Sequence, residues 1–168
     1  GATLSWMQEH SKKLDSCIVG SLQVKENNKF YNRLYVVKPN EVQYYDKRYL
    51  FSMADEDKHF SRGEKELIFE IKGWKIKPLI CYDLRFPVWS KNKYKNKEFT
   101  YDILVYVANW PAARSDAWKA LLKASYLHYF HFELRGRHPL AKAFSSLQCH
   151  LSYSGFFRLL FGSMCSDK

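Results

Sequence analysis

The chain has 168 residues, of which 46% are hydrophobic, so it is long enough and apolar enough to bury the core of a globular domain. No apolar run approaches the roughly 20 residues that a membrane-spanning helix needs, and the first residues show no secretion signal. Four dispersed cysteines without a CxxC pair favour reduced thiols in the cytoplasm. The net charge of +10 raises the question of nucleic acid, but the densest lysine cluster, residues 90–99, is typical of a solvated loop. We therefore expect neither a nucleic-acid nor a membrane partner.

The first 130 residues predict six strands between an opening and a closing helix. The predicted elements are a helix at 5–13, strands at 16–22, 29–39 and 42–47, a polar loop at 48–65, two strands within 66–80, a buried strand at 101–109 and a helix at 114–130. In the first helix Trp6 is expected to face inward, and Ser115 or Asp116 is the expected N-cap of the last. This order predicts an α/β protein in which helices lie outside a sheet.

Cys81 stands where an apolar strand ends and a charged, aromatic segment begins, in the sequence LICYDLRFPVW. A residue at the carboxyl end of a central strand projects into the crevice where α/β sheets bind ligands. The following main-chain N–H groups could stabilise an oxyanion there. A nucleophilic thiolate needs a neighbouring base or cation, and no histidine is near Cys81 in sequence. The pattern leaves two interpretations, a nucleophile or a buried structural cysteine.

The composition changes near Ala124. All five tryptophans precede it, whereas residues 125–168 contain six of the twelve phenylalanines, four of the six histidines and only two acidic residues. This segment is either a short helix with an apolar end or sequence foreign to the preceding fold. Its potential zinc ligands have no recognised finger spacing, so we predict no metal site; they are His128, His131, Cys149, His150 and Cys165.

Three blocks, YYDKRYLFSMADEDKHFSRG, GWKIKPLICYDLRFPVWS and YDILVYVANWPAARSDAWKALLKA, resemble the carbon–nitrogen hydrolase (nitrilase) superfamily, and most closely its omega-amidase-like branch. The resemblance covers residues 1–124, with the blocks in the family's order. It implies part of an α-β-β-α sandwich and a cofactor-independent, cysteine-dependent hydrolysis of amide bonds. The implied substrates are omega-amides of 2-oxo dicarboxylic acids, which release ammonia. It also implies a homo-oligomer.

The family's Glu–Lys–Cys triad, carried over by the resemblance, places the nucleophile on Cys81 and the lysine on Lys47. The Lys47 ammonium group and the N–H of Tyr82 would stabilise the oxyanion. A second, supporting glutamate of the family falls on Glu56, with Asp55 as the alternative.

Three residues near Cys81 are candidates to bind the substrate. Arg85 could bind a substrate carboxylate through two hydrogen bonds, or could serve in an ordinary ion pair. Asn109 and Trp110 end the next buried strand and are expected on the same rim as Cys81. Trp110 could equally be an anchor of the core.

The sequence departs from the family at both ends. No residue matches the general-base glutamate, which the family carries upstream of the helix at 5–13, and the blocks expected after Ala124 are missing. We therefore interpret residues 1–124 as a partial carbon–nitrogen hydrolase domain, truncated at its N-terminus, and residues 125–168 as a divergent or frameshifted tail. A non-catalytic fragment or relative and a basic nucleic-acid-binding module remain alternatives to an active amidase.

Overall fold

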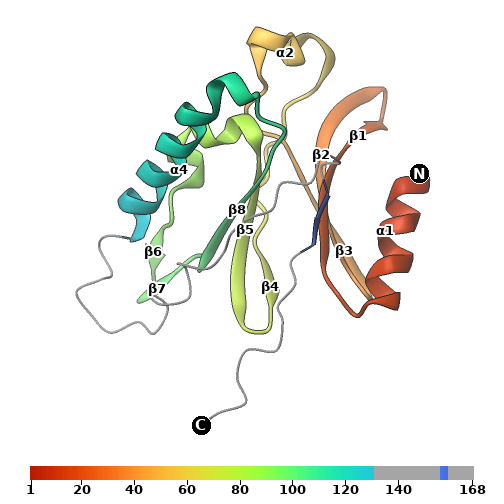
Figure 1. The fold of residues 1–168 in the computed structure, drawn as a ribbon. Coiled ribbons are helices and arrows are strands. Elements are labelled where there is room, and N and C mark those ends of the chain that lie inside the picture. Colours follow the sequence, from red (N-terminus) through yellow and green to blue (C-terminus); the bar gives the residue numbers. More distant parts are fainter. Residues whose placement is uncertain (131–155, 159–168) are drawn as a thin grey trace. The chain divides into compact units, whose positions relative to one another are not determined.

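The computed structural model describes residues 1–130 and 156–158, and the chain divides into two compact units. Of the described residues, the first unit holds 1–67 and 156–158, and the second holds 68–130. Each unit is a sheet with a helix along one face (Figure 1). The predicted α/β class is therefore confirmed.

The first unit is an antiparallel sheet in the order β3-β2-β1-β9. Its elements are α1 (Ala2–Lys13), β1 (Ile18–Glu26), β2 (Lys29–Lys38), β3 (Glu41–Asp46), the 3-10 turn η1 (Ser52–Ala54), α2 (Glu56–His59) and β9 (Phe156–Arg158). Asn27 and Asn28 join β1 to β2 with φ angles of 48° and 60°. Asparagine tolerates this left-handed backbone, and two such residues give the twist that a two-residue hairpin needs.

Helix α1 packs on the sheet through Met7, which is fully buried in a cluster with Ile18, Tyr35 and Val37. The expectation that Trp6 faces inward is wrong, because this side chain is 45% exposed. Instead, its ring stacks on His10, one turn later, with 4.2 Å between centroids. A helix that covers one sheet face buries a single stripe, and here that stripe includes position 7 and leaves position 6 outside it.

The sheet face that α1 leaves uncovered carries the buried side chains of Leu34, Val36 and Tyr45 beside polar ones. Leu34 pairs with Tyr45 across β2 and β3, and both side chains are buried. Lys47 extends this pairing beyond the end of β3, because its N–H donates to the carbonyl of Asn32 at 2.9 Å. Since side chains alternate along a strand, Asn32 and Lys47 lie on the same face as Leu34 and Tyr45.

The second unit combines β4 (Phe69–Ile71), β5 (Trp74–Ile80), β8 (Ile103–Val107), η3 (Ala112–Arg114) and α4 (Ser115–Phe130). A tight turn at Lys72 and Gly73 joins β4 to β5, as predicted, and β5 pairs in parallel with β8. The expectation that 101–109 is a fully buried strand is wrong, because in β8 only Val107 is buried. Within the described residues β8 is the edge strand of this sheet and pairs with β5.

The segment between β5 and β8 contains more structure than the predicted solvated loop. It holds η2 (Cys81–Arg85), α3 (Pro87–Ser90), β6 (Tyr94–Lys95) and β7 (Glu98–Phe99). The side chain of Asn92 closes the base of the β6–β7 hairpin through hydrogen bonds to the main chain of Thr100 and Tyr101. Side-chain hydrogen bonds of this kind are a frequent means of ordering an otherwise polar loop.

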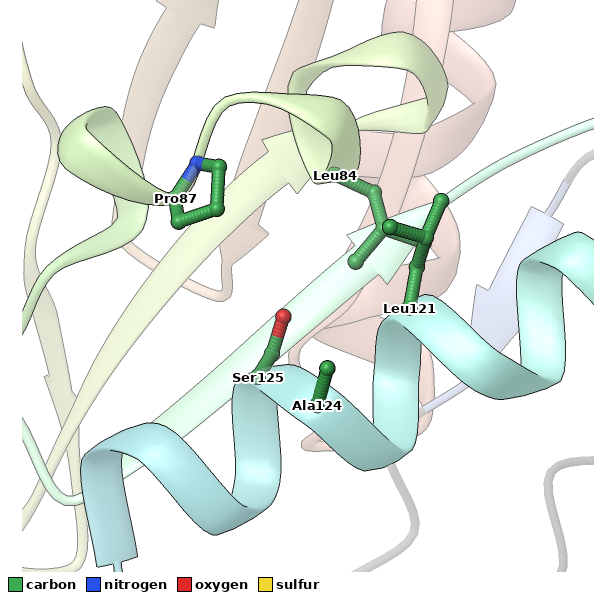
Figure 2. A pocket seen from close by; sticks show the side chains of 5 residues that line it. All are labelled: Leu84, Pro87, Leu121, Ala124 and Ser125. Carbon is green, nitrogen blue, oxygen red and sulfur yellow. The ribbon is translucent and has the colours of Figure 1, made fainter.

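A cavity of about 220 Å³ lies between the residues that follow Cys81 and helix α4. It is lined by Leu84, Pro87, Leu121, Ala124 and Ser125, and Figure 2 shows Leu121 pointing from α4 toward Leu84. Helix α4 continues past Ala124 to Phe130 without a break. The proposed domain boundary at Ala124 stays a prediction, and most of the tail lies outside the described residues.

Candidate active site

Cys81 lies at the carboxyl end of β5, directly after Ile80, with a left-handed φ of 44°. For a residue with a side chain this backbone costs on the order of 1 kcal/mol, and such strain is common where a side chain has a functional orientation. The thiol is partly exposed, and its Sγ lies 4.0 Å from the carbonyl oxygen of Asn109. Parallel pairing of β5 with β8 ends both strands at one edge, which brings Cys81 and Asn109 together as predicted.

Asp83 stabilises the turn that carries Cys81. Its carboxylate is fully buried and accepts a hydrogen bond from the N–H of Ile80 at 3.0 Å. Its carbonyl accepts from the N–H of Phe86 at 3.0 Å, and the ring of Tyr82 packs edge-on against Phe86. Sequence reasoning missed Asp83. The available signal was an acidic side chain three residues after the last strand residue, a spacing at which carboxylates often accept a main-chain N–H.

Arg85 and Trp110 are also brought together. The guanidinium carbon of Arg85 lies 5.9 Å from the centroid of the Trp110 ring, within range of a cation–π contact. Arg85 is exposed, and none of the ion pairs among the described residues includes it.

Trp110 has a framework role as well. Its Nε1–H donates to the carbonyl of Arg114 at 2.9 Å, and its ring packs on Trp118 with 4.9 Å between centroids. The two interpretations of Trp110, pocket wall and anchor, are therefore compatible with one position.

Lys47 and Glu56 form a close ion pair in the first unit. Lys47 Nζ lies 2.5 Å from Glu56 Oε2, with side chains that are only 3% and 19% exposed. The same oxygen accepts from the N–H of Phe51 at 2.6 Å, and Oε1 accepts from Asn32 Nδ2 at 3.3 Å. Asp55, the alternative partner, instead pairs with Lys58 on its own loop. Of the two acids considered from sequence, Glu56 is therefore the one that contacts Lys47.

The environment of Glu56 favours its ionised form. Burial by itself raises the pKa of this carboxyl group. The hydrogen bond and charge of Lys47, together with the Phe51 N–H and the Asn32 amide, outweigh burial and hold the pKa below its ordinary value of 4.5. At neutral pH the pair is therefore an ammonium group beside a carboxylate.

A neck of main-chain contacts closes the loop that carries Glu56. The N–H of Gly63 donates to the carbonyl of Lys47 at 2.9 Å, and Arg48 Nη1 donates to the carbonyl of Gly63 at 3.0 Å. A Cβ at Gly63 would lie 2.0 Å from the carbonyl oxygen of Asp46, so only glycine fits this close approach. The neck thereby fixes where the chain leaves the sheet at Lys47.

The predicted site residues are divided between the two units. Lys47 and Glu56 belong to the first, whereas the second holds Cys81, Tyr82, Arg85, Asn109 and Trp110. Among the described residues no group of three or more histidine, cysteine or acidic side chains could hold a metal ion, and no helix is long and apolar enough to cross a membrane. The potential zinc ligands considered from sequence lie outside the residues whose side chains are described.

Comparison with known proteins gives consistent matches. The model of the family described as Carbon-nitrogen hydrolase matches residues 1–132. The chain is 46% identical to omega-amidase YafV of Escherichia coli K12 over 122 residues. This stretch covers 72% of this chain and 46% of that protein. It is 37% identical to the 2-oxoglutaramate amidase of Bacillus subtilis over 123 residues, 71% of this chain and 46% of the relative. The chain thus spans about half the length of these curated relatives.

Solved structures show the same relationship. XC1258 of Xanthomonas campestris, a CN-hydrolase superfamily protein with an arsenic adduct in its active site, matches with a TM-score of 0.74 and 40% identity. The match covers 76% of this chain and 49% of that one. Nit3 of Saccharomyces cerevisiae shares the fold, with a TM-score of 0.65 and 20% sequence identity. That match covers 76% of this chain and 47% of Nit3. The chain belongs to the carbon–nitrogen hydrolase family.

Proposed function

We propose that this chain carries the cysteine, the lysine and the supporting glutamate of an amidase that acts on omega-amides of 2-oxo dicarboxylic acids. The observation that carries the proposal is Cys81, which stands on a left-handed turn at the end of a strand in a family member. The buried pair of Lys47 and Glu56, on the positions that the family motif assigns, supports it. The names of two relatives, an omega-amidase and a 2-oxoglutaramate amidase, suggest the substrate class.

The proposed reaction is acyl transfer through a thioester. The Cys81 thiolate attacks the amide carbonyl carbon, and the C–N bond then breaks as the nitrogen takes a proton and leaves as ammonia. Water attacks the thioester and releases the carboxylate with the free thiol. In the family's triad, as carried over by the resemblance, the ammonium group of Lys47 and the N–H of Tyr82 would stabilise the negative oxygen of each tetrahedral intermediate. A thiol nucleophile of this kind suits a reducing compartment, so we assign the reaction to the cytoplasm.

Substrate recognition is proposed for the rim around Cys81. Arg85 is exposed and in contact with Trp110, so it can bind the carboxylate of a 2-oxo acid through two parallel hydrogen bonds. Trp110 and Asn109 would form the wall beside it. Arg85→Gln should raise KM about 10- to 100-fold for the carboxylate-bearing amide and leave KM for an uncharged amide unchanged. Equal effects on both substrates would remove Arg85 from the recognition site.

Ammonia release from the omega-amide of a 2-oxo acid tests the proposed activity. The full chain should release ammonia, Cys81→Ala should abolish the release, and Cys17→Ala, which alters a buried cysteine of the first unit, should retain it. The family's general-base glutamate has no match in this sequence, and its absence from a triad costs on the order of 10³-fold or more. The assay therefore needs single-turnover sensitivity. No release from folded protein would overturn the proposed activity for this chain.

The assembly state belongs to the same proposal. Homo-oligomers are expected from the resemblance to the family, and sedimentation of the full chain would show whether it associates. A concentration-independent monomer would overturn that part of the proposal.

A further inference from the structure

Asn32 contacts both members of the ion pair between Lys47 and Glu56. Its carbonyl oxygen accepts a hydrogen bond from the main-chain N–H of Lys47 at 2.9 Å. Its side-chain Nδ2 donates to Glu56 Oε1 at 3.3 Å. One strand residue therefore holds the main chain of the lysine and the side chain of the glutamate.

The two oxygens of Glu56 are held differently. Oε2 accepts from Lys47 Nζ at 2.5 Å and from the N–H of Phe51 at 2.6 Å. Among the hydrogen bonds between described residues, the contact from Asn32 is the one that reaches Oε1. Rotation about the Cγ–Cδ bond moves both oxygens, so the two bonds to Oε2 already restrain it, and a donor on the second oxygen restrains the plane of the group further. The Asn32 amide supplies that second donor.

We propose that Asn32 is a positioning residue, which fixes the plane and the ionised state of the Glu56 carboxylate and, through it, the ammonium group of Lys47. Its catalytic meaning rests on the proposed amidase function, but the contacts themselves lie within the first unit. An amide suits this position because it donates a hydrogen bond without adding charge. An aspartate would place a second carboxylate against Oε1, and an aliphatic side chain would leave Oε1 without this donor.

The charged residues next to Glu56 in sequence do not provide its ion-pair partner. The loop that carries it also holds Asp55, Asp57, Lys58 and His59, and Lys58 pairs with Asp55 at 2.9 Å. The cation that reaches Glu56 is Lys47, from the end of the sheet. A substitution of Asn32 therefore acts on the Glu56 carboxylate, and the ion pair between Glu56 and Lys47 is the charged contact that it can change.

The test is an NMR titration of Glu56 in the full chain labelled with ¹³C-glutamate. The Glu56 signal is identified by its loss in Glu56→Gln. Asn32→Asp should raise the pKa of Glu56 by about one unit or more, because two carboxylates then share the site. The matched control is Gln23→Asp, which adds the same charge at the exposed residue that pairs with position 32 in β1. It should move the titration by less than about half a unit.

Asn32→Ala covers the case in which the aspartate variant does not fold. It keeps the main-chain contact to Lys47 and removes the donor, so the pKa of Glu56 should still rise, by less than in Asn32→Asp. An unmoved titration in the folded variants, or equal shifts in Gln23→Asp and Asn32→Asp, would overturn the inference. In an active chain, Asn32→Ala should lower kcat and shift the acidic limb of the pH profile upward.

The titration separates this inference from the proposed function, because it requires no turnover. An inactive chain in which Asn32→Asp shifts Glu56 would contradict the amidase proposal and support the positioning role. Ammonia release that depends on Cys81, together with an unmoved Glu56, would do the reverse.

Discussion

Gly63→Ala is the substitution whose effect follows most directly from the geometry around Lys47. The added Cβ would lie 2.0 Å from the carbonyl oxygen of Asp46 and 2.7 Å from its carbon, whereas ordinary contact begins at 3.4 Å. Both neighbours are main chain, so the loop has to move by more than about 1 Å. That movement breaks the hydrogen bonds from Gly63 to Lys47 and from Arg48 to Gly63. Overpacking of about 1–3 kcal/mol and two lost hydrogen bonds of about 1 kcal/mol each predict a loss of about 4 kcal/mol in the free energy of unfolding.

Urea unfolding of the full chain, followed by circular dichroism, measures this loss. Gly73→Ala is the matched control, since a Cβ there meets no atom within 4 Å and only its left-handed φ of 82° opposes the change. We expect it to cost about 1 kcal/mol, and both variants lose the same freedom in the unfolded state. Hydrogen exchange should then show faster exchange of the position-63 amide in the first variant. If Gly63→Ala is no more destabilising than Gly73→Ala, the close approach to Asp46 is not a constraint.

Three further predictions follow from burial and charge. Glu56→Gln leaves the buried Lys47 without its counter-charge and should cost about 3 kcal/mol at pH 7. The pKa of Glu56 is lower in the folded than in the unfolded protein, so the stability lost in Glu56→Gln should shrink as pH falls through the folded pKa. Urea unfolding at pH 7 and 3 checks this, and a loss that does not change with pH would exclude the ion pair as its origin. Leu84 is 1% exposed and lines the cavity, so Leu84→Ala should enlarge it and lower the free energy of unfolding by about 3 kcal/mol in urea unfolding. A loss under about 1 kcal/mol would mean that neighbouring side chains move in and fill the added space. Burial raises the pKa of Cys17 to about 11, so iodoacetamide at pH 8 should modify the partly exposed Cys81 before Cys17 in peptide mapping, and faster labelling of Cys17 would contradict the structure.

The regular elements could be predicted from sequence because their patterns are local. The turn at Gly73, the strand before Cys81 and the helix at 115–130 each follow a repeating apolar pattern. The predicted N-cap was wrong, because Ser115 and Asp116 both lie inside α4. The position of Cys81 beside Asn109 also followed from sequence, since two apolar runs were expected to end on the same rim of a sheet.

Contacts between distant residues were beyond sequence reasoning. Nothing in the pattern around Asn32 marks it as the partner of Glu56, because the contact depends on how a loop folds back over the strand. Asp83 was missed for a similar reason, since a buried carboxylate and an exposed one look alike in sequence. The prediction that Trp6 faces inward was wrong because Trp6 and Met7 are neighbouring apolar residues on one helical turn. Only packing decides which of the two side chains is buried, and here it is Met7.

The parallel pairing of β5 and β8 offers a route for protein engineering. Both strands begin at the end of the sheet near the β6–β7 hairpin, where Lys75 pairs with Glu98, and finish at the end that carries Cys81. Seven residues of β5 span about 20 Å, so the two edges are well separated. A reporter peptide or fluorophore inserted between Asn96 and Lys97, at the tip of the hairpin, would protrude from the edge opposite the thiol. Labelled protein could then be immobilised or observed without modification of Cys81.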